Sequence, residues 1–422
     1  MSKNNLRFID LFAGIGGTRI GFEQACSQQG FSALCVFSSE IKAHAIQAYK
    51  TNFHDKEIAG DIQKIAEHKI PNFDYLLAGF PCQPFSSAGK RKGFLDDRGS
   101  LFFDIIRILK AKKPIGFLLE NVDGLVNHDN GKTFDEIIKT LKNLGYNISW
   151  SILNAADFGV PQNRKRVYIV GHLKKKIQLT NFDKKSRCIQ DILEENIPLY
   201  DTKFSKLLLE NYTIEQLTGK SIKDKRGGND NIHSWDINLK GQISKEQKDL
   251  MNILLKKRRM KKWATLKGIV WMDGMPLMVS EIETFYQHPK LQGLLDDLTK
   301  KGYLKLEHLK NIFIKNGGIR VREYDTTKEK GYNIVAGKLS FPISKIIDPK
   351  GYVPTIVATE IGKLAIPVGK GIRGFTVREG LRLSGYPETY SLDKLDYYKA
   401  FDLIGNTVMP PVIQEIVVRM LS

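Results

Sequence analysis

The sequence predicts an α/β protein with an open, doubly wound sheet and a smaller second domain. In the first part of the chain, short apolar runs alternate with amphipathic stretches of helical length, which is typical of a parallel sheet covered by helices. The first run, residues 6–12, breaks at the glycine-rich turn AGIGG before a helix that begins near Thr18. From about residue 174 to about residue 350 the chain changes to lysine-rich segments, which suggests a separate domain. Further strands are expected at residues 33–39, 73–78, 115–119, 147–153 and 166–170.

The charge of the chain points to a polyanionic partner. There are 65 Lys and Arg residues against 46 Asp and Glu, which gives a net charge of +19 at pH 7. A surplus of this size is typical of proteins that bind nucleic acid. A lysine-rich proteome would give the same total, so the charge alone leaves both explanations open.

Nothing in the sequence indicates export, a membrane span or a metal site. No apolar run approaches about 20 residues, and the first residues lack the apolar region of a signal peptide. The four cysteines form no CxxC pair and no His-Cys cluster with metal-ligand spacing. We therefore expect a cytoplasmic protein without a membrane contact, a metal or a disulfide framework. The cysteines are Cys26, Cys35, Cys82 and Cys188.

The segment GFPCQPFS at residues 79–86 presents one of these cysteines beside a sheet. Cys82 follows the strand expected at residues 73–78, and open α/β sheets carry their chemistry beyond the carboxyl ends of strands. Pro81 and Pro84 restrict the backbone on both sides of the thiol. Since a free thiol has a pKa of about 8.5, a nucleophilic role needs a base, a positive field or a polarised substrate nearby. A buried cysteine in a proline-rich turn is the structural alternative.

A glycine-rich turn and two acids predict an adenosine pocket. Gly14 and Gly16 let a ligand approach the backbone, and the next helix offers unpaired N–H groups. The spacing departs from G-x-G-x-x-G, which argues against a nicotinamide or flavin pyrophosphate. Glu40 ends the second strand, where this architecture contacts ribose hydroxyls, and Asp61 is placed to accept from an adenine amino group. Either acid alone could be a helix cap or a surface charge.

Three more polar residues are expected near the thiol. Glu120 follows the strand at residues 115–119 and should face the same cleft as Cys82. Arg164 and Arg166 alternate on one face of an emerging strand, although a solvated edge is the alternative. Residues 87–99 carry three glycines and a basic triplet, and we expect them to form a mobile lid.

Together these motifs resemble the bacterial DNA cytosine-5 methyltransferases of restriction–modification systems. The match is ordered along the chain and covers roughly residues 6–175 and 350–422. No position that the family uses for catalysis departs from its pattern. The match comprises DLFAGIGG at residues 10–17, Glu40, Gly60 and Asp61, GFPCQPFS at 79–86, ENV at 120–122, QNRKR at 162–166, REGLRLSGYP at 378–387 and GNTV at 405–408.

The resemblance implies a Rossmann-like, S-adenosylmethionine-dependent methyltransferase fold and a covalent mechanism. Cys82 would add to C6 of cytosine, which makes C5 nucleophilic towards the methyl group of S-adenosylmethionine. Glu120 would hydrogen-bond N3 and the exocyclic amine. Arg164 and Arg166 would help to bind the base and would favour the thiolate. The cytosine must be flipped out of the duplex, since C5 and C6 are inaccessible inside the stack.

The resemblance also implies which residues hold S-adenosylmethionine. Phe12 would lie against the adenine ring, and Gly14 and Gly16 would let the methionine moiety approach the backbone. A segment near the far end of the chain would close the pocket, and the apolar helix at residues 412–421 would pack onto the first domain. The residues so assigned to the cofactor are Phe12, Gly14, Gly16, Glu40, Asp61, Asn406 and Val408.

These assignments predict a discontinuous catalytic domain at residues 1–173 and 351–422 around a target-recognition domain at 174–350. In the latter, the basic run at residues 256–262 is expected to contact phosphates, with a solvated helix face as the alternative. Residues 276–315 read as helical and residues 319–324 as a strand, which suggests a winged-helix-like unit.

Double-stranded DNA is the expected substrate, a cognate restriction endonuclease the implied partner, and a monomer the expected state. Two other functions stay open. A transfer RNA methyltransferase would use the same chemistry, although the large basic insert argues against it. A catalytically silent DNA-binding regulator would keep the fold, although intact Cys82, Glu120 and Arg164 argue against that.

Overall fold

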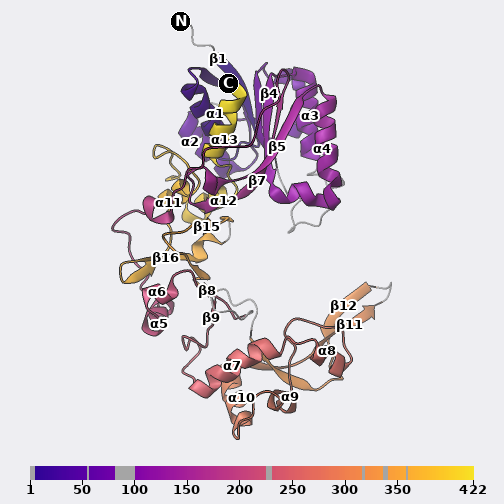
Figure 1. The fold of residues 1–422 in the computed structure, drawn as a ribbon, viewed down its shortest axis with the longest axis vertical. Coiled ribbons are helices and arrows are strands. Elements are labelled where there is room, and N and C mark those ends of the chain that lie inside the picture. Colours follow the sequence, from indigo (N-terminus) through magenta and orange to yellow (C-terminus); the bar gives the residue numbers. More distant parts are fainter. Residues whose placement is uncertain are drawn as a thin grey trace. The chain divides into compact units, whose positions relative to one another are not determined.

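The computed structural model describes residues 5–54, 57–80, 100–224, 231–315, 319–335, 341–357 and 360–422. Cys82 and the expected lid at residues 87–99 lie outside these ranges. The chain divides into two compact units (Figure 1). Unit 1 comprises Met1–Asn196, Pro349–Ile361 and Phe375–Ser422, and unit 2 comprises Ile197–Asp348 and Gly362–Gly374.

Unit 1 is built on a six-stranded sheet with the order β2-β1-β3-β4-β7-β5. β1, β2, β3 and β4 run parallel, whereas β7 is antiparallel to both of its neighbours. β1 lies between β2 and β3, so the direction in which the chain adds strands reverses there, and ligands of open α/β sheets bind beyond such a point. The strands are β1 (Asn5–Leu11), β2 (Ser32–Ser39), β3 (Tyr75–Gly79), β4 (Gly116–Val122), β5 (Asn147–Asn154) and β7 (Lys165–His172).

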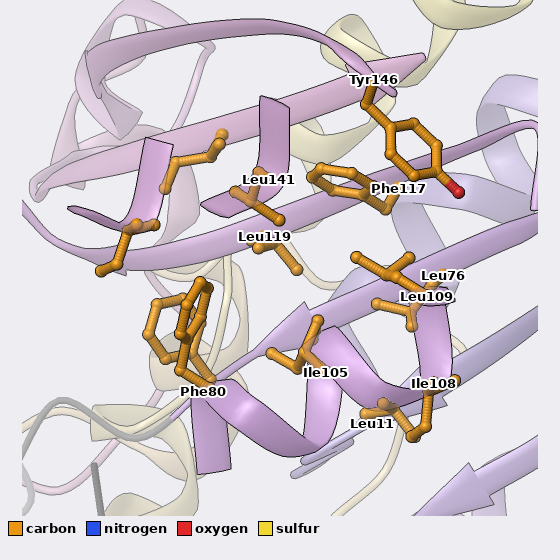
Figure 2. Packing of buried hydrophobic residues seen from close by; sticks show 14 of the residues in the cluster. Leu11, Leu76, Phe80, Ile105, Ile108, Leu109, Phe117, Leu119, Leu141 and Tyr146 are labelled. Carbon is orange, nitrogen blue, oxygen red and sulfur yellow. The ribbon is translucent and has the colours of Figure 1, made fainter. Parts of the chain in front are cut away.

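Helices cover both faces of this sheet. On one face, α1 (Gly17–Gln28) and α13 (Pro410–Leu421) pack together over Phe8 and Leu118. Gly21 permits this close approach, because a Cβ there would lie 2.5 Å from the carbonyl oxygen of Pro410. On the other face, α3 (Ser100–Lys112) and α4 (Lys132–Asn143) form a second cluster with strand residues, which Figure 2 shows around Leu76, Ile105, Phe117, Leu119 and Leu141.

The remaining elements of unit 1 frame the carboxyl edge of the sheet. β6 pairs parallel with β15, which brings residues 353–354 beside residues 162–163. α2 follows β2, and α11 and α12 precede the C-terminal helix. Their bounds are α2 (Ala43–Phe53), β6 (Gln162–Asn163), β15 (Val353–Pro354), α11 (Val377–Arg382) and α12 (Tyr397–Gly405).

Unit 2 contains two hydrophobic clusters. One lies in a five-stranded sheet with the order β17-β16-β14-β8-β9 and the helices α5 and α6. The other gathers α7, α8, α9 and α10 with the pair β10 and β13. The bounds are α5 (Lys203–Asn211), α6 (Ile214–Leu217), β8 (Ser221–Ile222), β9 (Asn231–Ile232), α7 (Lys245–Lys257), α8 (Lys262–Lys267), α9 (Val279–Glu283), α10 (Leu291–Lys300), β10 (Leu304–His308), β11 (Lys310–Lys315), β12 (Ile319–Tyr324), β13 (Lys330–Ile334), β14 (Lys345–Ile346), β16 (Leu364–Val368) and β17 (Gly371–Arg373).

The division into units differs from the expected domain boundaries by two residues at Pro349, where residue 351 was expected, and more widely in two other places. Residues 174–196 belong to unit 1, where Ile177 and Leu179 pack into the cluster of α1 and α13. Residues 362–374 belong to unit 2, because β16 pairs with β14 and β17 pairs with β16.

The helical expectation for residues 276–315 is wrong in its second half. α10 ends at Lys300, and Gly302 adopts φ 78°, a conformation that stops a helix. Residues 304–308 and 310–315 are then strands with alternating side chains. Across the described residues, no helix combines the length and the apolar character that a membrane crossing requires.

Candidate functional site

The glycine-rich turn after β1 uses left-handed backbone conformations. Phe12, Gly14 and Gly16 have φ values of 55°, 54° and 77°. Gly16 has no room for a side chain, since a Cβ there would clash with the ring of Phe53. The Gly14 N–H donates to Glu40 Oε2 at 2.8 Å. The turn is therefore fixed against the end of β2.

The two acids expected at an adenosine pocket lie on adjoining segments. Glu40 Oε1 accepts hydrogen bonds from the N–H groups of Ile41 and Lys42, both at 2.8 Å. The Glu40 N–H donates to the carbonyl oxygen of Ala59 at 2.9 Å, which brings Asp61 to the same end of β2. Asp61 Oδ1 accepts from the Gln63 N–H at 3.1 Å and caps a short helix, Ile62–Lys64. Glu40 and Asp61 thus share one edge of the sheet.

An apolar side chain stands beside these acids. Ile41 is 75% exposed although it directly follows Glu40. An exposed isoleucine next to two carboxylates and a glycine turn suits a ligand with a flat ring and hydroxyl or amino donors. The residues present therefore fit the adenosine part of S-adenosylmethionine.

The C-terminal segment reaches the same edge. A Cβ on Gly17 would clash with the carbonyl oxygen of Val408, and a Cβ on Gly79 would lie 3.0 Å from the Val408 side chain. Val408 thus packs between the start of α1 and the end of β3. Asn406 lies at the end of α12, where its Nδ2 donates to the Asp402 carbonyl oxygen at 2.8 Å.

Glu120 is a buried carboxyl group at the centre of this edge. It is 7% exposed, lies in β4 and pairs in register with Gly79 of β3. Arg166 Nε lies 3.1 Å from Glu120 Oε1. Burial raises the pKa of Glu120, and the neighbouring Arg166 and Arg164 oppose that shift.

Arg164 has a different environment from Arg166. It is 3% exposed and donates to three carbonyl oxygens, those of Ile356 at 3.3 Å, Gly405 at 3.1 Å and Thr407 at 2.8 Å. Burial lowers the pKa of Arg164 to about 9. We expected both arginines on one face, but only Arg166 meets Glu120. Arg164 instead joins the segment after β15 to the segment after α12.

The expected nucleophile, Cys82, lies outside the described residues, yet the chain leading to it is fixed. Phe80 is buried, and its carbonyl oxygen accepts a hydrogen bond from Asn121 Nδ2 at 3.2 Å. The backbone therefore leaves β3 beside the residue that follows Glu120. The expected lid at residues 87–99 also lies outside the described residues.

A buried carboxyl group was missed by the sequence reasoning. Asp10 is fully buried in β1 and accepts hydrogen bonds from Thr18 Oγ1 at 2.7 Å and from the Tyr49 hydroxyl at 3.2 Å. The signal available was an acid inside an otherwise apolar run. Burial raises the pKa of Asp10 to about 7, against the opposing effect of the bond from Thr18.

Asp10 predicts a pH dependence of stability. Between about pH 4 and pH 7 the folded protein holds a proton that the unfolded chain has lost, so the free energy of unfolding should fall as pH rises. The shift from 3.8 to about 7 corresponds to about 4 kcal/mol at most. Asp10→Asn should flatten this decline. Urea denaturation at pH 5 and pH 8 measures it, and an equal decline in the variant would contradict the assignment.

The fold and the site define a class of protein. A sheet with one reversed strand, a glycine turn after β1 and acids after β2 form the architecture of S-adenosylmethionine-dependent methyltransferases. Among the described residues, no group of three His, Cys, Asp or Glu side chains is arranged to hold a metal ion.

The chain belongs to the family of C-5 cytosine-specific DNA methylases, whose family model matches residues 6–422. It is 54% identical over 425 residues to the Type II methyltransferase M.NlaIV of Neisseria lactamica and 52% identical over 423 residues to M.NgoBV of Neisseria gonorrhoeae. Each match covers 99% of both chains. The methyl donor of this family is S-adenosylmethionine, and the expected family, fold and enzyme class are confirmed.

Solved structures agree in fold. The S. pombe Dnmt2 methyltransferase has a TM-score of 0.55 at 18% identity, and the match covers 99% of this chain and 98% of that one. The Entamoeba histolytica methyltransferase EhMeth has a TM-score of 0.53 at 18% identity, with 100% of both chains covered.

Proposed function

We propose that this protein methylates C5 of a flipped cytosine within a specific duplex DNA sequence, with Cys82 as nucleophile and Glu120 as the group that binds the base. The observation that carries the proposal is the buried Glu120, paired with Arg166 and in register with Gly79, three residues before Cys82. The relatives named Type II methyltransferases support a role in a restriction–modification system.

In the proposed reaction, the Cys82 thiolate adds to C6 and makes C5 nucleophilic. C5 would then take the methyl group that S-adenosylmethionine supplies when bound, the bond from its sulfur to the methyl group would break, and S-adenosylhomocysteine would leave. A base removes the C5 proton, the bond from sulfur to C6 breaks, and 5-methylcytosine leaves with the thiolate restored. The cytosine must be flipped out of the stack for the thiol to reach C6.

Glu120 would bind the Watson–Crick edge of the flipped base. A protonated carboxyl group can donate to N3 while its other oxygen accepts from the exocyclic amine. The raised pKa of Glu120 favours the protonated form, and it results from burial. Arg166 lies beside this carboxyl group and would hold it in place. Arg164 would act through the backbone segments it joins, since its guanidinium donates to their carbonyl groups.

The cofactor would occupy the edge between the glycine turn and the C-terminal segment. Glu40 would accept from the ribose hydroxyls, and Asp61 from the adenine amine, in keeping with their position at one end of β2. Phe12 and Ile41 offer apolar surface for the adenine ring. The backbone at Gly14 and Gly16 would admit the methionine moiety, with Asn406 and Val408 closing the pocket.

Unit 2 would recognise the target sequence. The expected phosphate contacts at residues 256–262 need one correction, because Arg258 is buried and bonds to Asn333, and Arg259 pairs with Asp273. The exposed lysines of that run are Lys256, Lys257, Lys261 and Lys262. We place the enzyme in the cytoplasm as a monomer, acting on double-stranded DNA beside a cognate endonuclease.

Methyl transfer from labelled S-adenosylmethionine to duplex DNA, measured beside transfer RNA, tests the proposal. Label in DNA alone is expected, and bisulfite sequencing of DNA from an expressing cell would identify the site. Label in transfer RNA alone would favour the related RNA methyltransferases, and label in neither would favour a silent DNA-binding regulator.

The cofactor assignment predicts a loss of affinity in two variants. Asp61→Ala and Glu40→Ala should each raise the Kd for S-adenosylmethionine by about tenfold or more, since each removes a hydrogen-bond acceptor for the ligand. Titration calorimetry measures this. Asp74→Ala is the control, because Asp74 accepts a bond from the Arg7 N–H at the opposite end of the strands. Unchanged affinity in both pocket variants would refute the assignment.

A further inference from the structure

The strands β11 and β12 form a two-stranded ribbon that projects from unit 2. They pair only with each other among the described strands, and Figure 1 shows them beyond the helices of their cluster. No described residue of the ribbon belongs to a hydrophobic core cluster. Ile314 is 74% exposed and Tyr324 is 47% exposed. With Phe313 at 38%, three large hydrophobic side chains are exposed on this one ribbon, and gathered exposed apolar surface is a feature of binding sites.

The base of the ribbon is firmly attached. Leu309 is buried, and its carbonyl oxygen accepts from the Asp325 N–H at 2.8 Å, which joins the two strands where they leave the core. Asn311 Nδ2 donates to Asp325 Oδ2 at 3.2 Å. The Tyr324 hydroxyl donates to Glu307 Oε2 at 2.9 Å, and Lys310 Nζ lies over the Tyr324 ring. The ribbon is thus held in one orientation relative to its own cluster.

The strand register sorts the ribbon's side chains into two faces. Directly opposed residues share a face, and the face alternates along each strand. The pairs on one face are Lys310 with Tyr324, Ile312 with Arg322, and Ile314 with Arg320. We call this the basic face, because it carries three cations and no acid. Beyond the backbone pairing of the two strands, no hydrogen bond or ion pair connects the side chain of Arg320 or Arg322 to another described residue.

We propose that the basic face of this ribbon enters the major groove of the target duplex and that Arg320 and Arg322 read guanines there. The inference rests on the proposed function, which supplies duplex DNA as the substrate. The B-DNA major groove, about 12 Å wide, admits a two-stranded ribbon. A face with three cations attracts a polyanion such as DNA, and we therefore favour DNA over an acidic or apolar protein surface as the partner.

The spacing of the arginines fits base reading. Residues two apart on a strand lie about 6.8 Å apart, which equals about two base-pair steps. Each guanidinium can take O6 and N7 of one guanine. Ile314 opposes Arg320 and offers apolar contact to a thymine methyl group. Lys310, at the base of the ribbon opposite Tyr324, would contact a phosphate.

Methylation of a randomised duplex library, read by bisulfite sequencing, tests the proposal. The wild-type enzyme defines the site. Arg320→Ala and Arg322→Ala should each lower discrimination at one base pair by about tenfold or more, with the salt dependence little changed. Lys330→Ala, an exposed cation on β13 outside the ribbon, is the matched control and should leave discrimination unchanged. Unaltered melting temperature and cofactor affinity would verify folding of each variant.

Two results would overturn the ribbon's role while leaving the proposed function intact. The first is an active arginine variant with wild-type discrimination at every position. The second is an arginine variant whose methylation falls equally on all sequences and whose activity depends less steeply on salt concentration, which would indicate phosphate contacts alone. A wild-type enzyme that methylates no duplex would instead overturn the proposed function and the ribbon's role with it.

A crosslinking experiment tests the groove independently of turnover. Ile314→Cys should form a disulfide with a duplex that carries a thiol tether on cytosine N4, which lies in the major groove. Wild-type protein gives the background from the native cysteines. A tether on guanine N2 lies in the minor groove and should not react. Preferential reaction with the guanine tether would contradict the proposal, and so would failure of both tethers to react above background.

Discussion

Cys82→Ala should abolish methyl transfer while the affinity for S-adenosylmethionine stays largely unchanged. Without the thiolate nothing adds to C6, so C5 remains too weak a nucleophile to take the methyl group. The residues proposed to bind the cofactor lie elsewhere, on the turn after β1 and the segments after β2. Transfer from labelled cofactor and titration calorimetry measure the two quantities. Turnover near the wild-type rate would refute the covalent mechanism.

A matched cysteine and a modified substrate sharpen this test. Cys188→Ala removes a thiol whose partner is Asp191, far along the chain from the site, and should leave the rate unchanged. A duplex with 5-fluorocytosine at the target has no removable C5 proton, so wild-type enzyme should remain attached to it. Cys82→Ala should form no such adduct on a denaturing gel. An adduct in that variant would assign the attack to another residue.

The sequence predicts most of the strands of unit 1 and the acids at their ends because both signals are local. An apolar run followed by a polar residue predicts a strand that reaches Glu120 and another that ends before Glu40, although β4 continues past Glu120 to Val122. The contacts of Arg164 are beyond such reasoning. Its acceptors belong to Ile356, Gly405 and Thr407, which are 192 to 243 residues away in the chain.

Two other features also lie beyond the expectations from the sequence. Asp402 on α12 accepts hydrogen bonds from Lys42 Nζ at 2.7 Å and His44 Nε2 at 2.9 Å, across about 360 residues, so no local pattern could indicate it. The strands β10 and β11 lie in the stretch at residues 276–315 that we expected to be helical, with breaks at Gly293 and Gly302. The positive φ of Gly302 ends α10. The segments that follow are only five and six residues long, and runs this short favour strands over a helix.

Glu120→Gln should lower kcat by about 100-fold or more, the usual scale for losing a group that stabilises charge developing in the transition state. The amide keeps the size of the side chain but cannot carry the proton that a carboxyl group shares with N3. It also leaves Arg166 beside a neutral partner. Single-turnover methylation with saturating DNA and cofactor measures the step. Glu136→Gln on the exposed side of α4 removes one carboxylate remote from the site and is the control.

The pH profile separates a role in chemistry from a role in folding. Burial raises the pKa of Glu120, and the protonated fraction of an acid falls as pH rises through its pKa. If the protonated carboxyl group binds N3, the wild-type rate should therefore decline towards alkaline pH with a contribution from Glu120. The Gln variant should lose that contribution, while its free energy of unfolding stays close to that of the wild type. A rate loss confined to KM, or an alkaline limb that persists unchanged in the variant, would assign Glu120 to binding or packing alone.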